Sequence, residues 1–330
     1  MTKDFKSLKI EIMEQAAIDL EKIETALEQN LKPKLELVKK IASHLLFSGG
    51  KRLRPLLTIH SARLCNYDTG FEIEFSVLFE YLHAATLLHD DVVDKADIRH
   101  GKKAAHTKWS APKVVLTGDF LLAAALEIAA KTKNFQIISI IAKITKDMSE
   151  GEIDQLDKKG KLDLSEKEYL KIIERKTSVL IQGACQSGAV LANADKAKVQ
   201  ALKQYGFHLG MAFQMTDDIL DYTASAKELG KNPGTDIREG KLTLPLIYSL
   251  AQASSKDKIR MKNAITSNFF SPDLFESLKE KLYFYKGIEY TDKKAHSHVQ
   301  KAKTCLEIFH ACPSRKLLYQ IADYSITRKV

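Results

Sequence analysis

The chain has 330 residues, of which 45% are hydrophobic and 28% are charged, and its formal net charge is +9. This balance is typical of a folded globular protein and excludes a largely disordered chain. The basic residues are spread along the chain, without zinc-finger spacing or an arginine-rich arm, so nucleic acid is not expected as a partner. The positive charge favours an anionic small substrate, an anionic surface, or simply a solvated lysine-rich exterior.

Cysteine usage and hydropathy indicate where the protein works. The four cysteines form no C-x-x-C pair, so reduced thiols in a cytoplasmic protein are the simplest interpretation. The N-terminal segment MTKDFKSLKIEIMEQ is charged and amphipathic, without the apolar core of a secretory signal. The longest apolar stretches, 120–130 and 135–144, are shorter than the roughly 20 residues of a membrane span. We therefore expect a cytoplasmic protein with at most peripheral membrane contact.

The spacing of apolar residues predicts helices along most of the chain. Between residues 112 and 233 apolar side chains recur three and four positions apart, and strand alternation is nearly absent. Ser165 followed by Glu168 predicts a capping box, and Ser271 before a proline predicts another helix start. The segments expected to be non-helical are 47–50, 99–111, 158–163, 230–243 and 287–292. The sequence thus predicts one all-α domain over residues 1–330, with an N-terminal helix over 1–30.

The first segment with chemical character is GGKRLRP, at residues 49–55. Glycine lets the backbone approach an anion closely, and lysine and arginine supply contacts to phosphate oxygens. Lys51, Arg52 and Arg54 are therefore candidate anion ligands. The segment lacks the spacing of a Walker A motif, so ATP is not implied. For each cation taken alone, surface solvation is the simpler interpretation.

An aspartate cluster ends each of two apolar helical runs, at residues 90–94 and 217–221, with the same D-D-x-x-D spacing. Such a cluster taken singly is commonly a solvated helix end, but the repetition points to a shared site. If the clusters face each other, their carboxylates repel unless cations lie between them. Hard oxygen ligands that leave positions for water and phosphate suit Mg²⁺. The candidate ligands are Asp90, Asp91, Asp94, Asp217, Asp218 and Asp221.

Further cations accompany both clusters. Arg99 and His100 precede a glycine just after the first cluster, and Lys176 lies beside Thr177 within a predicted helix. After the second cluster, a loop carries Gly230-Lys231 and Gly240-Lys241. Together with the aspartates, these residues predict a site for a polyphosphate and Mg²⁺.

In order and spacing, these motifs resemble those of the trans-isoprenyl diphosphate synthases. The resemblance covers nearly the whole chain and is nearest to octaprenyl-type, long-chain synthases. It implies a helical bundle around a deep central cavity, usually a homodimer, which joins isopentenyl diphosphate to an allylic diphosphate primer head to tail (1′-4). It also implies Mg²⁺, with three ions when substrate is bound. The segments that carry it are GGKRLRP (49–55), LLHDDVVD (87–94), EGEIDQL (150–156), KT (176–177), FQMTDDILD (213–221) and LGKNPGTDIREGKLTLP (229–245).

The resemblance also implies a role for individual residues. The six aspartates hold or orient Mg²⁺ on the allylic diphosphate, while Thr177 and Gln214 lie near the developing allylic cation. The cations implied on the allylic diphosphate are Arg99, Lys176 and Lys231. The residues implied to bind isopentenyl diphosphate are Lys51, Arg54 and His83, and Gly50 and Lys241 are also implied to bind substrate. The chain departs from the family at His100, where a second arginine is usual. A histidine contact weakens as the pH rises, so we expect reduced affinity for isopentenyl diphosphate.

Product length depends, in the family, on side chains four and five positions before the first aspartate. Here these are the small residues Thr86 and Ala85, so we expect products longer than fifteen carbons, plausibly of thirty to fifty carbons for quinone side chains. The helix that contains Ile141 is expected to form the floor of the pocket. Three alternatives stay open: a geranylgeranyl (C20) diphosphate synthase, a class I terpene cyclase, and a noncatalytic subunit of a heteromeric synthase.

Overall fold

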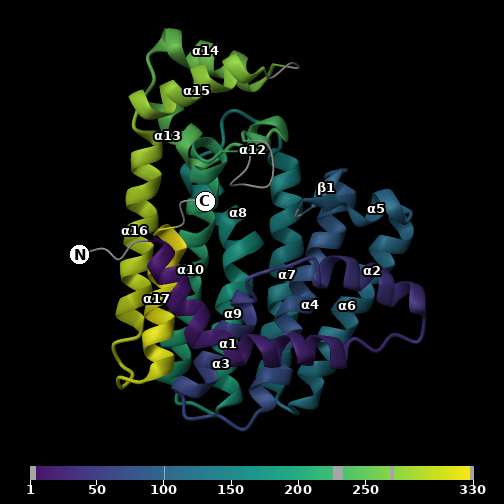
Figure 1. Ribbon diagram of the computed structural model, residues 1–330. Helices are drawn as coiled ribbons and strands as arrows, with labels where there is room; N and C mark the ends of the chain where they lie inside the picture. Colours follow the sequence, from purple (N-terminus) through teal and green to yellow (C-terminus); the bar gives the residue numbers. More distant parts are fainter. Residues whose placement is uncertain (1–4, 100, 226–232, 268–270, 328–330) are drawn as a thin grey trace. The chain divides into compact units, whose positions relative to one another are not determined.

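Helices make up most of the described chain, which in this computed structural model comprises residues 5–99, 101–225, 233–267 and 271–327 (Figure 1). The strands found in these ranges are β1 (Ile98–Arg99) and β2 (Lys102–Lys103), which pair antiparallel. The predicted all-α class is therefore confirmed. The helices are α1 (Phe5–Asn30), α2 (Glu36–Leu46), α3 (Leu53–Leu64), α4 (Phe71–Val93), α5 (Ala105–Lys108), α6 (Ala111–Lys131), α7 (Phe135–Lys158), α8 (Glu166–Ile173), the π-helix η1 (Glu174–Ser178), α9 (Val179–Leu191), α10 (Lys196–Thr223), α12 (Thr235–Arg238), α13 (Leu244–Gln252), α14 (Ser255–Ile265), α15 (Pro272–Phe284), α16 (Gly287–Cys305) and α17 (Pro313–Thr327).

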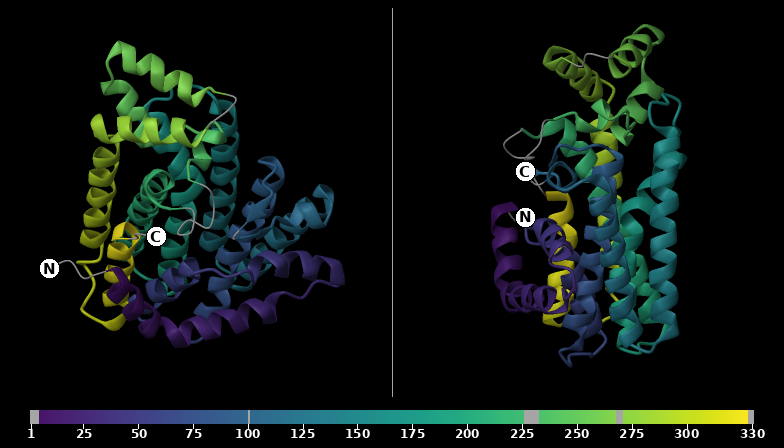
Figure 2. Two further views of the ribbon diagram at one scale, coloured as in Figure 1. Left: turned by 45° about the horizontal axis from the view of Figure 1, so that its top comes forward. Right: turned by 90° about the vertical axis from the view of Figure 1, so that its right-hand side faces the viewer.

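The chain divides into two compact units. Unit 1 comprises Met1–Lys146, Leu180–Gly206 and Cys305–Ile321, and unit 2 comprises Asp147–Val179, Phe207–Thr304 and Ala322–Val330 (their described parts are shown from two further sides in Figure 2). The following paragraphs describe each unit by itself. The assignment of residues 1–330 to a single domain stays a prediction.

Helix α4 lies at the centre of unit 1, where it packs chiefly against α6 and also against α1, α2 and α3. Its long apolar run buries Phe75, Phe79 and Leu88 completely. Gly118 of α6 permits close approach, since a Cβ atom there would lie 2.3 Å from the Nε2 atom of His89 on α4. Helix α4 is thus closely packed in unit 1, and it ends at the first aspartate cluster.

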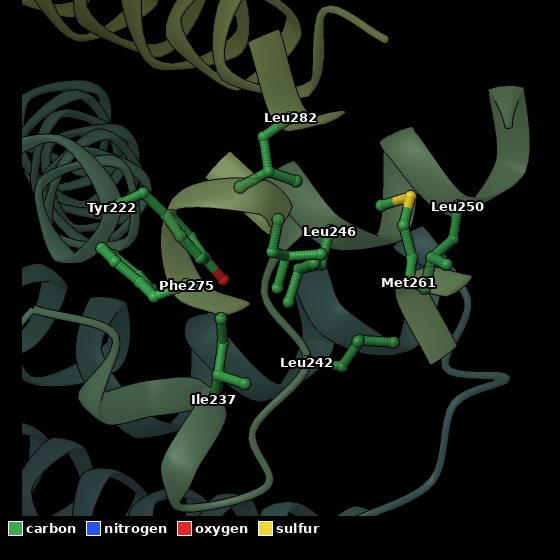
Figure 3. Close-up of a cluster of buried hydrophobic side chains, with 9 residues drawn as sticks. Tyr222, Ile237, Leu242, Leu246, Leu250, Met261, Phe275 and Leu282 are labelled. Carbon is green, nitrogen blue, oxygen red and sulfur yellow. The ribbon is translucent and has the colours of Figure 1, made fainter. Parts of the chain in front are cut away.

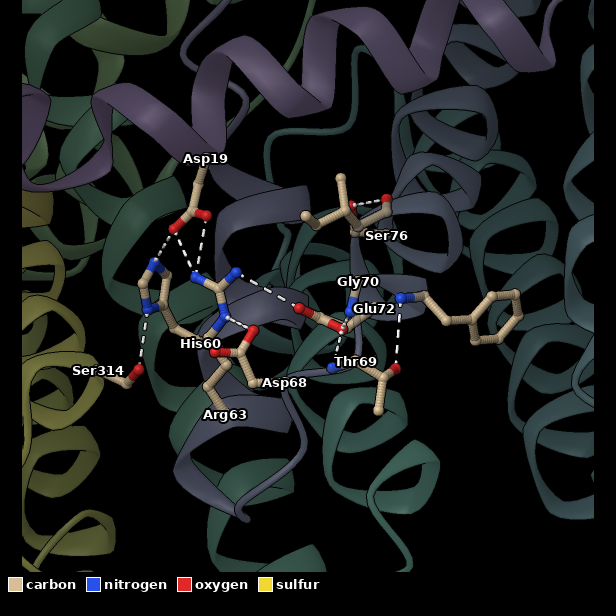
Figure 4. A network of polar contacts seen from close by, with 11 residues as sticks. Asp19, His60, Arg63, Asp68, Thr69, Gly70, Glu72, Ser76 and Ser314 are labelled. Atoms are coloured by element: carbon tan, nitrogen blue, oxygen red, sulfur yellow. Dashed lines mark hydrogen bonds and ion pairs between the residues drawn. The ribbon is translucent and has the colours of Figure 1, made fainter.

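A buried polar network joins three helices of unit 1 (Figure 4). Arg63 of α3 donates to both carboxylate oxygens of Asp19 on α1, at 2.9 and 2.8 Å, and pairs with Glu72 of α4 at 3.4 Å. The carboxylate of Glu72 in turn accepts from the backbone amide of Gly70 at 2.8 Å, at the N-terminus of α4. A negative charge at this helix end is favourable, so the network fixes where α4 begins.

In unit 2 an apolar core holds the segment that follows the second aspartate cluster (Figure 3). Tyr222 at the end of α10 packs with Ile237, Leu242, Leu246 and Phe275. Its hydroxyl also lies 2.6 Å from the hydroxyl of Thr243. Ile237 and Leu242 flank residues 238–241, so burial of these two side chains determines the path of the loop.

Both predicted helix starts are confirmed. At the start of α8, the Ser165 side chain accepts from the Glu168 backbone amide, and the Glu168 carboxylate accepts from the Ser165 backbone amide. At the start of α15, the Ser271 side chain accepts from the Leu274 backbone amide. The non-helical prediction for 287–292 was wrong, because α16 begins at Gly287. A Cβ atom there would lie 2.2 Å from the Pro245 carbonyl oxygen, so this glycine serves close helix packing, not a loop.

Two other segments predicted to be non-helical contain short elements. Residues 99–111 carry part of the β1–β2 hairpin and the single turn α5, and residues 233–243 carry the turn α12. Elements this short have no periodicity that a sequence window can detect.

Candidate active site

The first aspartate cluster lies at the C-terminal end of α4, in unit 1. Asp90 and Asp91 belong to the last turn of the helix, and Asp94 is its C-cap, with its amide donating to the Asp90 carbonyl oxygen at 2.8 Å. Asp91 is buried, and Arg99 of β1 donates to its Oδ1 atom at 2.7 Å. The short hairpin that the sequence does not predict therefore places Arg99 beside the cluster.

The glycine-containing loop before α3 is correctly predicted, and one of its three cations, Arg52, takes part in an ion pair. Gly49 and Gly50 have φ angles of 109° and 146°, which other residues rarely adopt. Arg52 turns inward: it is buried, binds Glu24 through Nε at 2.6 Å, and donates to the carbonyl oxygen of Leu46 at 2.7 Å. Arg52 is thus a structural ion-pair partner.

The remaining candidate residues of unit 1 differ in accessibility. Lys51 is exposed before α3, whereas Arg54 in the first turn of α3 and His83 on α4 are half-buried.

A small pocket in unit 1 is lined by His44, Leu45, Ser48, Asp91, Arg99, Lys102, Lys103, Ala104 and Ala105. Its basic side chains outnumber its one carboxylate, which favours an anion. The chain-length candidates Ala85 and Ile141 are buried, and Thr86 is half-buried.

In unit 2, Lys176 and Thr177 lie on the π-helical turn η1, between α8 and α9. Two glycines let neighbouring helices approach this turn closely. A Cβ atom on Gly151 of α7 would lie 2.7 Å from the Arg175 Cβ, and one on Gly210 of α10 would lie 2.5 Å from the Ser178 Cα. Single π-turns of this kind are often found at functional sites, and here the turn aims both side chains at one pocket.

A chain of hydrogen bonds runs from Thr177 into the core of unit 2. The Thr177 hydroxyl donates to the amide oxygen of Gln214 at 2.7 Å, and the Gln214 amide nitrogen donates to the Asp218 Oδ1 atom at 2.8 Å. The hydroxyl of Tyr169, on α8, donates to the Asp218 Oδ2 atom at 2.6 Å. The four side chains therefore form one continuous network.

Burial dominates the acid–base properties of this network. Burial, with the charge of Asp236 adding to it, raises the pKa of Asp218 well above its usual value, although hydrogen bonds from Tyr169 and Gln214 oppose the shift. Burial and the neighbouring Asp218 carboxylate also raise the pKa of Tyr169. Burial thus disfavours the ionised form of Asp218, and a cation bound beside this carboxyl would favour that form again.

The segment after the second cluster is tied to Asp221, the last aspartate of that cluster. The Asp236 amide donates to the Asp221 carboxylate at 3.1 Å, and the Gly234 amide donates to the Asp221 carbonyl oxygen at 2.8 Å. This connection brings Asp236 and Lys241 to the pocket that also contains Asp218. Asp217, on the same helix, is half-buried.

The resulting pocket of unit 2 has a volume of about 140 Å³. Its polar lining combines four lysines with two carboxylates, and its inner wall is aliphatic and aromatic. A cavity with this charge pattern fits a polyanion accompanied by a cation, next to an apolar group. The lining residues are Gln155, Lys158, Lys159, Leu164, Tyr169, Ile172, Ile173, Lys176, Thr177, Gln214, Asp218, Asp236, Gly240, Lys241, Leu242 and Thr243.

The donor set of each cluster fits a hard divalent cation only in part. Within the described ranges, no group of three His, Cys, Asp or Glu side chains converges on a point where a metal ion could bind. An ion bound by one or two of these carboxylates would therefore complete its shell with water and substrate oxygens, as Mg²⁺ commonly does. The two clusters belong to different units, so their pairing across a cavity stays a prediction. His100 and Lys231 lie outside the described residues.

Comparison with known proteins identifies the family. Residues 35–282 match the polyprenyl synthetase family. The chain belongs to this family. It is 33% identical over 318 residues to octaprenyl diphosphate synthase from Haemophilus influenzae, covering 96% of each chain. It is also 33% identical to heptaprenyl diphosphate synthase component 2 from Bacillus subtilis, covering 94% of this chain and 88% of that one.

The solved structures agree with this assignment. A polyprenyl synthase from Caulobacter crescentus, complexed with calcium and isoprenyl diphosphate, matches with a TM-score of 0.92 and 36% identity, covering 100% of this chain and 99% of that one. The resemblance inferred from the motifs is therefore confirmed. No helix of the described segments is both long and apolar enough to cross a membrane.

Several residues of the site have no individual signal in the sequence. Tyr169, Lys158 and Lys159 line the pocket, although nothing about their spacing distinguishes them from ordinary helix residues. Glu152 binds Lys176, and its only signal is its place in the EGEIDQL segment. Asp236 lies within the motif segment 229–245, but only the fold shows that it lines the same pocket as Asp218.

Proposed function

We propose that the protein is a Mg²⁺-dependent trans-prenyltransferase that joins isopentenyl diphosphate to an allylic diphosphate, releases diphosphate, and forms products longer than fifteen carbons. The observation that carries the proposal is the unit 2 pocket, where Lys176 and Lys241 lie with Thr177 and Gln214 over an apolar wall. The relatives named above, octaprenyl and heptaprenyl diphosphate synthases, support a long-chain product.

The chemistry requires charge neutralisation, which this lining supplies. The carbon–oxygen bond of the allylic diphosphate breaks, and its electrons leave with the diphosphate. Lys176, Lys241 and, by resemblance, Lys231 would bind the departing charge. Bound Mg²⁺ would supply further charge neutralisation at the diphosphate oxygens. The Asp218 and Asp236 carboxylates make the pocket suitable for such cations.

The allylic cation is then attacked by the double bond of isopentenyl diphosphate, and a proton is lost to regenerate an alkene. No protein nucleophile is needed. Water would quench the cation, so a dry, apolar wall is required. Leu164, Ile172 and Ile173 provide such a wall in the pocket, while the oxygen atoms of Thr177 and Gln214 favour nearby positive charge.

The decisive experiment is a product analysis. Purified protein, Mg²⁺, isopentenyl diphosphate and farnesyl diphosphate should release diphosphate and give polyprenyl products that mass spectrometry resolves by length. A C20 ceiling would indicate a geranylgeranyl diphosphate synthase, which keeps the reaction but excludes a product of thirty to fifty carbons. Turnover of the allylic substrate without isopentenyl diphosphate would indicate a cyclase and would replace the proposal.

One relative is named as a component of a synthase, so a heteromeric enzyme is the second candidate. We propose instead a cytoplasmic homodimer. Leu116 and Leu126 on α6 are 66% and 41% exposed, which supports burial of this face against a second copy. The free cysteines support a reducing compartment. Light scattering should give a dimer mass, and activity of the chain alone separates the two candidates.

A further inference from the structure

We infer that Tyr169 and Asp218 are positioning residues, which fix the direction of the hydrogen bonds that reach Thr177. The inference rests on the proposed prenyl transfer, because it assigns how Thr177 comes to present its oxygen to a cation. The geometry behind the inference does not depend on turnover. Of the two tests described below, the exchange measurement is also independent of turnover.

Tyr169 is held rigidly. Its ring is buried in an apolar cluster with Ile173, Met211, Met215 and Leu244, and close packing of this kind restricts side-chain movement. Its hydroxyl donates to one carboxylate oxygen of Asp218, and the other oxygen accepts from Gln214. The carboxylate is therefore fixed on both sides by donors from two different helices, α8 and α10.

This arrangement determines which end of the Gln214 amide faces Thr177. The amide carries donors on nitrogen and acceptors on oxygen, and its nitrogen is engaged by Asp218. Its oxygen must then face Thr177, which donates its single hydroxyl proton at 2.7 Å. Because that proton is used, only lone pairs of the Thr177 oxygen remain for the pocket. An oxygen presenting lone pairs stabilises developing positive charge.

Loss of the Tyr169 hydroxyl should reverse this order. Asp218 would lose a donor in a buried place and could turn away from Gln214. The amide of Gln214 could then flip and donate to Thr177, whose own proton would turn toward the pocket. A proton facing the cation is repulsive, so the chemical step should slow while substrate binding is preserved.

Steady-state kinetics test this on the full-length enzyme. For Tyr169→Phe, which keeps the buried ring, kcat should fall about tenfold or more, with both KM values within about twofold of wild type. The matched control is Tyr205→Phe, which removes an equally buried hydroxyl bonded to the Leu318 carbonyl oxygen and should leave kcat unchanged. The double variant with Thr177→Val should lose little more than Thr177→Val alone. A rise in KM with kcat intact, or additive losses, would overturn the inference.

A second measurement does not need activity. The side-chain amide protons of Gln214, followed by NMR, should exchange with solvent at least tenfold faster in Tyr169→Phe than in wild type, and at the wild-type rate in Tyr205→Phe. Unchanged exchange in Tyr169→Phe overturns the inference even if the kinetics agree. If wild type forms no product from the two diphosphates, the proposed function fails, and the exchange rates alone decide whether Tyr169 positions Gln214.

Discussion

The ammonium nitrogen of Lys176 lies 2.6 Å from a carboxylate oxygen of Glu152 and also donates to Gln155 at 2.7 Å. Both side chains of the ion pair are mostly buried, with exposed fractions of 25% and 19%. A lysine held this way loses little conformational entropy when a phosphate approaches it. The ion pair therefore holds the Lys176 ammonium group in a fixed position at the pocket.

Replacing Lys176 by methionine should lower kcat/KM for the allylic diphosphate by about 10- to 100-fold, the value of one charged hydrogen bond. The matched control is Lys303→Met. Lys303 is similarly buried, with 24% exposure, and pairs with Asp323, but it does not line the pocket. Radiometric assays of both variants check the prediction, and equal losses would show that only ion-pair stability is involved.

Metal removal should abolish turnover. With a chelator present, product formation should stop, and added Mg²⁺ should restore it, because few protein ligands hold the ion between turnovers. Asp90→Asn and Asp217→Asn should each lower kcat at least 100-fold and raise the Mg²⁺ concentration for half activity. Asp323→Asn, a carboxylate paired with Lys303, serves as the control. Full activity in chelator would contradict the metal-dependent mechanism.

The helices and their starts were predictable because local chemistry determines them. Ser165 and Ser271 cap their helices through contacts within four residues, which the sequence displays directly. The family motifs likewise predicted residues that line the pocket, such as Lys176 and Gln214. These features need no knowledge of distant contacts.

What could not be predicted depends on contacts between distant segments. Gly287 resembles a loop residue in the sequence, but a glycine is needed there because a Cβ atom would clash with the Pro245 carbonyl oxygen of α13. Arg52 resembles the neighbouring cations in sequence, yet its side chain is buried and forms ion pairs with Glu24 and Glu80. Tyr169 is separated from Asp218 by 49 residues, so only the packing of α8 on α10 reveals their contact.

The histidine at position 100 should limit affinity for isopentenyl diphosphate. His100→Arg replaces an imidazole by a permanent, bidentate cation, so KM for isopentenyl diphosphate should fall by about threefold to tenfold. Initial rates check this, with KM for the allylic primer as the internal control. An unchanged or higher KM for isopentenyl diphosphate would refute the interpretation.

Thr86 should control product length. Thr86 is half-buried on α4, and its hydroxyl bonds only to the His83 carbonyl oxygen of the preceding turn among the contacts described. Thr86→Phe should therefore fold and shorten the longest product. Thr86→Val, which removes the hydroxyl at equal volume, should leave the product ladder unchanged.

Ala85 offers a contrasting case. It is buried, so Ala85→Phe should cost about 1–3 kcal/mol of stability through overpacking, as well as shortening the products. Mass spectra of the products and urea unfolding curves separate the two effects. An unaltered ladder in both Phe variants would remove these positions from the pocket.

The ion pair between Asp19 and Arg63 should contribute strongly to stability (Figure 4). Asp19→Asn leaves a mostly buried guanidinium without its bidentate partner, which should cost about 3 kcal/mol at pH 7. Arg63 also pairs with Asp68, whose side chain is 71% exposed, so Asp68→Asn should cost less than about 1 kcal/mol. Urea unfolding of the two variants gives a direct comparison, and similar losses would show that burial does not matter here.

The same pair predicts a pH dependence. Burial alone raises the pKa of Asp19, but hydrogen bonds from His60 and Arg63 and the Arg63 charge outweigh it, so the folded-state pKa lies below the usual 3.8. A depressed pKa stabilises the folded state at pH values above the unfolded pKa, and this contribution is lost as the pH falls through the folded value. The gap in unfolding free energy between wild type and Asp19→Asn should thus shrink as the pH falls below about 4. Because the asparagine side chain of the variant cannot titrate, a gap that stays constant down to pH 3 would mean that the Asp19 charge contributes nothing to the network.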